Sequence, residues 1–177
     1  MTTIRKSNGF ALLDLVFVCG IIGLISSIAL PRLLLAKQVA GAASAIGSLR
    51  TLASAELTFA LTCGSGFYAP NLTSLGTPPP GSNEAFVGGD LGTADIVQKS
   101  SYTFRVDAAP FAGAPASCNG LGPGQTGRGY AAAADPIGGD NVRFFGTNAN
   151  AGLWEHNATL WNDMPEVGEP PIGTVLR

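Results

Sequence analysis

Residues 9–31 read GFALLDLVFVCGIIGLISSIALP, and this stretch decides the fold. From Phe10 to Leu30 the only ionisable side chains are Asp14 and Cys19, and every other residue is apolar, Gly or Ser. As an α-helix the run extends roughly 31 Å at about 1.5 Å per residue, which matches the hydrocarbon core of a bilayer. The stretch therefore predicts a transmembrane helix over residues 10–30.

Two basic residues, Arg5 and Lys6, precede the predicted span. Basic residues beside a first span favour keeping that end in the cytoplasm, so we expect the body of the protein to face outward. A cleaved secretory signal is a less favoured interpretation, because its apolar stretch is only about 7 to 15 residues long. A plain single-pass anchor is a second alternative, but it leaves Asp14 unexplained, since an acid at the bilayer centre costs about 2.5 to 3.5 kcal/mol.

Three segments in fixed order, Gly9–Leu15, Cys19–Gly23 and Ile28–Pro31, resemble the N-terminal signature of type IV pilins and of the pseudopilins of type II secretion. The resemblance implies a short basic leader, residues 1–9, which a prepilin peptidase removes by cutting between Gly9 and Phe10. It implies N-methylation of the new terminal Phe. It also implies an α+β fold, in which a long N-terminal helix packs on a small antiparallel β-sheet head.

Asp14 stands where the family usually has Glu. Cleavage would create an ammonium on Phe10, and Asp14 lies four residues on, about one helical turn away on the same face. This pair, within one subunit or between neighbours, would fix the register of subunits in a filament. The family also has a helix-loosening Gly and Pro where this chain has Gly23 and Pro31. We therefore expect subunit assembly to involve Phe10, Asp14, Gly23 and Pro31. The alternative is an Asp14 that simply lies at the level of the lipid headgroups.

The predicted helix continues beyond Pro31 as an amphipathic segment over residues 31–61. Pro31 lacks an N–H group, so it should loosen the helix from Gly23 onward without ending it. Small residues are dense from Ala40 to Ala45 and would let helices approach closely. Apolar residues recur four and three positions apart, the spacing of one helical face; they are Leu35, Val39, Ala42, Ile46, Leu49, Ala53 and Leu57.

Residues 62–177 form the predicted head, and most of the 24 Gly and 12 Pro lie there. A long loop is expected over residues 63–100, with a short helix near Ala94–Val97. Strand signals follow, separated by turns that are short enough for antiparallel neighbours; they cover Ser101–Val106, Gly129–Ala134, Asn141–Gly146 and, weakly, Gly152–Glu155. The tail from Asn162 to Arg177 contains three Pro and should be irregular.

The chain has three cysteines. Cys19 lies inside the predicted span, about 65 Å along a straight helix from Cys63, so these two residues cannot bond within one subunit. Cys63 and Cys118 both fall in the outward part, where the environment is oxidising. We expect one disulfide between them, with two unpaired thiols as the alternative.

Several classes of function are disfavoured by the sequence. The net charge of -2 argues against a phosphate-binding surface, so no nucleic-acid partner is expected. The single His, His156, has no triad or metal spacing around it, and we expect neither catalysis nor a cofactor. Asp135, Asp140 and Asn141 lie in a Gly-rich loop that resembles the calcium loop of some pseudopilins, but turn formation is the favoured interpretation. Trp154 and Trp161 could form a surface contact, although core packing is expected for at least one of them.

The favoured interpretation is a prepilin that is polymerised into a type IV pilus-like filament. Its expected partners are other copies of the chain, a prepilin peptidase, an inner-membrane assembly platform with a separate ATPase, and membrane lipid before assembly. We expect it first in the cytoplasmic membrane with its head outward, then in an extracellular or periplasmic filament. A pseudopilin of a type II secretion or DNA-uptake system is an alternative, and a solitary membrane-anchored binding module is a less favoured one.

Overall fold

The computed structural model describes residues 12–139 and 141–176. Gly9, Phe10 and Asp140, which carry predictions made above, lie outside the described residues. The chain divides into two compact units, Met1–Val39 and Ala40–Arg177, which are treated separately below.

Helix α1 runs from Leu12 to Thr62 and includes Pro31 without a break. Proline cannot donate a hydrogen bond to the carbonyl four residues earlier, here that of Ser27, yet the flanking residues retain helical structure. The two units use this helix differently. Up to Val39 nearly all its described side chains are exposed, whereas from Ala42 onward one face is buried.

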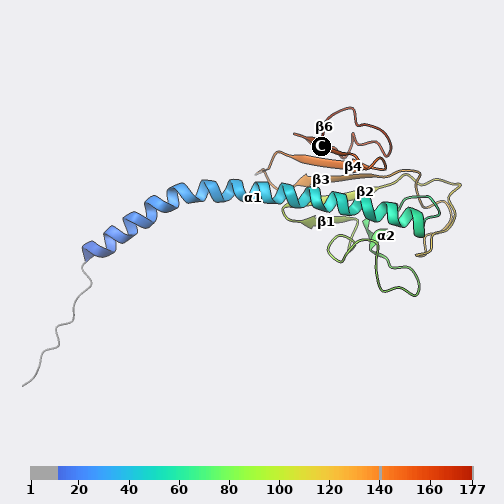
Figure 1. Ribbon diagram of the computed structural model, residues 1–177, viewed down its shortest axis with the longest axis horizontal. Helices are drawn as coiled ribbons and strands as arrows, with labels where there is room; N and C mark the ends of the chain where they lie inside the picture. Colours follow the sequence, from blue (N-terminus) through green and yellow to red (C-terminus); the bar gives the residue numbers. More distant parts are fainter. Residues whose placement is uncertain (1–11, 140, 177) are drawn as a thin grey trace, which may run out of the picture. The chain divides into compact units, whose positions relative to one another are not determined.

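The head, Ala40–Arg177, contains a six-stranded antiparallel sheet in which every strand pairs with the next one along the chain (Figure 1). The strands are β1 (Ile96–Lys99), β2 (Tyr102–Asp107), β3 (Ala131–Pro136), β4 (Phe144–Asn148), β5 (Leu153–His156) and β6 (Thr174–Val175). The long helix and this antiparallel sheet confirm the α+β class. The four predicted strands correspond to β2, β3, β4 and β5, each displaced by one to three residues at its ends.

Two local predictions for the head were wrong. The short helix predicted near Ala94–Val97 is instead β1, which pairs with β2 through a two-residue turn at Ser100 and Ser101. The loop predicted over residues 63–100 contains the short helix α2 (Leu72–Gly76), whose N-cap side chain, Asn71 Oδ1, accepts a hydrogen bond from the Ser74 N–H at 2.9 Å. The tail is irregular, as predicted, apart from the two-residue strand β6.

The main core lies between α1 and one face of the sheet (Figure 1). On that face Ala134 of β3 pairs with Phe104 on one side and with Phe145 on the other, so a small residue alternates with two large ones. The helix contributes buried residues three and four positions apart, which are Ala42, Ala45, Leu49, Leu52, Glu56 and Phe59. This set shares only Ala42 and Leu49 with the predicted face, and Leu57 is 52% exposed.

The C-terminal segment covers the opposite face of β3 to β5. Leu160 and Met164 pack there against Trp154, which is 5% exposed, so the expectation that one Trp is a core residue is confirmed. Gly146 in β4 makes this possible, because a Cβ at that position would lie 2.3 Å from Met164 Cε. The tail is also fixed by Asn148, whose Nδ2 donates to the carbonyls of Pro165 and Gly168 at 2.9 and 2.7 Å.

Candidate functional site

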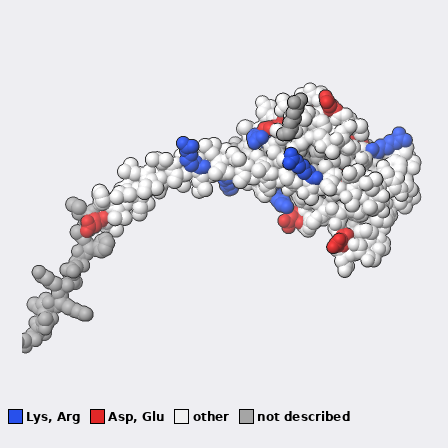
Figure 2. All heavy atoms as spheres, in the orientation of Figure 1, with Lys and Arg blue, Asp and Glu red and all other residues white. Residues whose placement is uncertain are grey.

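The helix of the first unit exposes apolar side chains along its described length. Their exposed fractions run from 42% to 73%, and they are Leu15, Val16, Phe17, Val18, Ile21, Ile22, Leu24, Ile25, Ile28, Leu30, Leu33, Leu34, Leu35 and Val39. Charged residues are few here, as the mostly white helix in Figure 2 shows; between residues 12 and 39 they are Asp14, Arg32 and Lys37. An apolar surface of this extent requires a covering, by lipid or by other protein.

The part of the chain that the structure describes contains one helix long and apolar enough to cross a membrane, and it lies near the N-terminus. It is a candidate membrane anchor. Asp14 lies in the first turn of α1 and is exposed. Its predicted partner, the amino group of Phe10, lies outside the described residues together with the predicted cleavage site at Gly9.

Two glycines leave gaps on the surface of this helix. At both Gly20 and Gly23 a Cβ would meet no other atom within 4 Å, so neither glycine is required by packing inside the chain. In a membrane, glycines allow the backbones of two helices to approach closely. As predicted, the helix continues through Pro31. Cys19 is a free, exposed thiol on the same helix.

Cys63 and Cys118 are joined by a disulfide, with the two Sγ atoms 2.01 Å apart. The bridge ties the segment that follows α1 to the loop between β2 and β3. A backbone hydrogen bond runs beside it, from the Cys118 N–H to the Cys63 carbonyl at 3.1 Å. The distal end of the helix is therefore held to the head by a covalent bond.

Two residues of the suggested calcium loop, Asp135 and Asn141, are engaged in other contacts. Asp135 Oδ2 accepts hydrogen bonds from Arg105 Nη2 at 3.2 Å and from the Thr159 hydroxyl at 2.8 Å. Asn141 Oδ1 accepts the Arg143 N–H at 3.2 Å, which is a turn contact. No group of three or more His, Cys, Asp or Glu among the described residues is arranged to hold a metal ion.

His156 is half-buried and lines a shallow hollow of about 320 Å³ at the end of β5. The neighbouring polar groups are bonded to each other, because Arg143 Nη2 donates to Glu155 Oε2 at 2.9 Å. This hydrogen bond from Arg143 lowers the pKa of Glu155. The Trp161 ring packs against a cation, because the Arg105 guanidinium lies 5.0 Å from its ring centroid.

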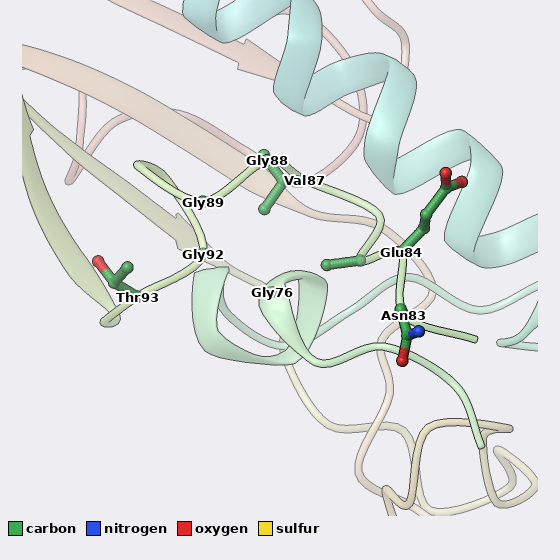
Figure 3. A pocket seen from close by; sticks show the side chains of 9 residues that line it. Gly76, Asn83, Glu84, Val87, Gly88, Gly89, Gly92 and Thr93 are labelled. Carbon is green, nitrogen blue, oxygen red and sulfur yellow. The ribbon is translucent and has the colours of Figure 1, made fainter. Parts of the chain in front are cut away.

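A larger hollow, of about 520 Å³, lies among the loops around α2. Figure 3 shows that the polar side chains on its rim, Asn83, Glu84 and Thr93, point away from its centre. Its floor is backbone at Gly76 and Gly92, which are so close that a Cβ on Gly76 would lie 2.1 Å from the Gly92 carbonyl oxygen. The hollow presents no convergent set of polar groups for chemistry.

Glu56 was missed in the sequence. It lies on α1 with its side chain turned into the head and has 0% exposure. Its Oε2 accepts the Ala69 N–H at 2.9 Å, while Oε1 is buried without a hydrogen-bond partner. Burial raises the pKa of this carboxyl to about 8, although the hydrogen bond from Ala69 acts in the opposite direction. The only signal in the sequence was an acid at the spacing of the buried face.

Comparisons with protein-family models, with curated proteins and with solved structures found no match to this chain.

Proposed function

We propose that this protein is a prepilin, the precursor of a subunit of a type IV pilus-like filament. The observation that carries the proposal is the contrast along α1. Residues 14–39 expose an almost continuous apolar surface, whereas residues 42–60 bury one face in a folded, disulfide-linked head. A helix of this kind can be inserted in lipid before assembly and packed against copies of itself afterwards.

The proposed sequence of events follows from the N-terminal signature. A prepilin peptidase cuts after Gly9 on the cytoplasmic side, and Phe10 becomes the methylated terminus. An assembly platform in the inner membrane, driven by a separate ATPase, then moves the subunit from lipid into the filament. Asp14 pairs with a terminal ammonium, and Gly20 and Gly23 provide room for the neighbouring helix. A pseudopilus of a secretion or DNA-uptake system would use the same steps.

Substitution of Asp14 distinguishes a filament subunit from a solitary anchored binding module. A filament needs the acid for register, so Asp14→Leu should reduce sheared surface filaments at least tenfold, as counted by electron microscopy with antibody to this chain. Asp14→Glu should restore them, because it keeps the charge. Leu15→Ile serves as the control for an apolar change in the same turn. Normal filament numbers in Asp14→Leu, with normal membrane insertion, would favour the anchored module.

A further inference from the structure

Glu56 connects α1 to the segment that follows it. The chain leaves the helix at Thr62, turns through Cys63 and returns along the head to Ala69, whose N–H donates to Glu56 Oε2 at 2.9 Å. One residue earlier, Tyr68 exchanges two backbone hydrogen bonds with Gly127, at 2.8 and 3.0 Å. Glu56 therefore holds Ala69 against α1, while nearer the end of the helix the Gly64 and Gly66 N–H groups donate to the carbonyls of Phe59 and Ala60.

The surroundings of Glu56 contain no compensating charge. No Lys or Arg forms an ion pair with it among the residues that the structure describes. The titratable group that it influences is Tyr130, immediately before β3, whose pKa is raised by burial and then by Glu56. The Tyr68 ring lies 5.3 Å from the Tyr130 ring. Neither phenol can neutralise a carboxylate, so an ionised Glu56 would be a buried and unpaired charge.

We propose that Glu56 is a proton-operated latch: with its proton bound it holds the segment Gly64–Pro70 closed on α1, and loss of the proton shifts that segment toward an open state while the sheet stays folded. Opening breaks the Ala69 hydrogen bond and the Tyr68–Gly127 pair, and the carboxylate then reaches water. The latch does not depend on filament assembly, because all its parts lie within the head.

The direction of the pH effect follows from linkage. The closed state holds the proton up to about pH 8, whereas an opened Glu56 has an ordinary pKa near 4.5. Between these values the closed state binds one proton more than the open state, so the equilibrium constant for opening should rise about tenfold per pH unit. Above about pH 8 both states are ionised and the rise should stop. The closed state is therefore most favoured at low pH.

Native-state hydrogen exchange of the full chain in detergent tests the latch. The Ala69 amide should exchange by a local opening that is insensitive to low denaturant, with a protection factor that falls about tenfold per pH unit from pH 5 to 8 and then levels off. Amides of β3 and β4 should show much higher protection and a steep dependence on denaturant. Glu56→Gln, which keeps an acceptor for Ala69, should abolish the pH dependence of the local opening, and the exposed Glu84→Gln should not.

Two results would overturn the proposal. The first is a wild-type protection factor at Ala69 that stays constant between pH 5 and 8. The second is an Ala69 amide that exchanges only together with β3 and β4, which would mean that Glu56 contributes to global stability and holds no separate segment. Both results are measured on the wild-type chain, so the test does not depend on the folding of the Glu56→Gln variant.

Discussion

At the scale of single residues, the β1–β2 turn has an unusual composition. Ser100 and Ser101 have φ values of 50° and 67°, the left-handed region that two-residue hairpin turns require and that Asn and Gly usually occupy. The turn is also a contact point, since the Ser101 carbonyl accepts the Ile137 N–H at 2.9 Å and the Ser100 hydroxyl lies 2.9 Å from that of Ser44 on α1. These contacts therefore hold Ser100 and Ser101 at positive φ values, which serine disfavours.

Replacing Ser101 by glycine should stabilise the head. Glycine adopts positive φ without steric cost, so Ser101→Gly should raise the free energy of unfolding by about 1 kcal/mol. Ser101→Val places a β-branched side chain at the same φ and should lower the free energy of unfolding by a similar amount. Urea denaturation followed by circular dichroism measures both. Equal midpoints for the two variants would contradict the assignment of strain to this residue.

Glu56 and its neighbours explain why the buried face of α1 could not be located from the sequence. Between Ala40 and Ala60 most residues are small or apolar, so more than one set of positions satisfies a spacing of three and four. The predicted set ends at Leu57, yet the observed buried face includes Glu56 and leaves Leu57 exposed. Tertiary contacts, above all the hydrogen bond from Ala69, overrode the apparent polarity.

At the scale of elements, the four inner strands of the sheet were predicted and the two edge strands were not. β2 alternates buried and half-buried side chains over Tyr102–Val106, which is the expected signal. β1 has only four residues, and the turn that joins it to β2 lacks the usual Asn or Gly. β6 has two exposed residues and follows a Pro-rich stretch, so it exists only through its pairing with β5.

The disulfide should contribute strongly to the stability of the head. Cys63 and Cys118 are 55 residues apart, and in the chain-entropy model closing a loop of this length stabilises by about 4 kcal/mol. The double variant Cys63→Ser/Cys118→Ser should therefore unfold at lower urea, and Cys19→Ser, which removes the free thiol, should not change the midpoint. Thiol labelling of the native wild-type chain should modify one cysteine before reduction and three after it. Labelling of all three before reduction would contradict the bridge.

The tail was predicted to be irregular, and what the sequence could not reveal is the side chain that fixes it. Asn148 has 0% exposure and donates to two tail carbonyls, so Asn148→Ala should release residues 165–168 and cost about 1–3 kcal/mol. Limited proteolysis should then cut the tail many times faster than in the wild type. The exposed Asn162→Ala is the control. Unchanged cleavage in Asn148→Ala would show that Leu160 and Met164 hold the tail without it.

At the scale of the whole molecule, the two units meet different requirements. The head buries its apolar residues in two clusters, one on each face of the sheet, and a disulfide joins Cys63 to Cys118. The helix of the first unit leaves its apolar surface uncovered within the chain. Residues 9–31 predict the exposed apolar helix of the first unit, because an apolar run of that length with a single acidic side chain is rare in water-exposed helices.

The identity of the mature N-terminus tests the proposed function most directly. Intact-mass measurement and N-terminal sequencing of the protein from its native membrane should find a chain that begins with N-methylated Phe10, and Gly9→Val should leave the full precursor. Ser7→Ala, in the same leader, should be processed normally. A native chain that begins at Met1, or one cut well beyond Leu30, would contradict the account.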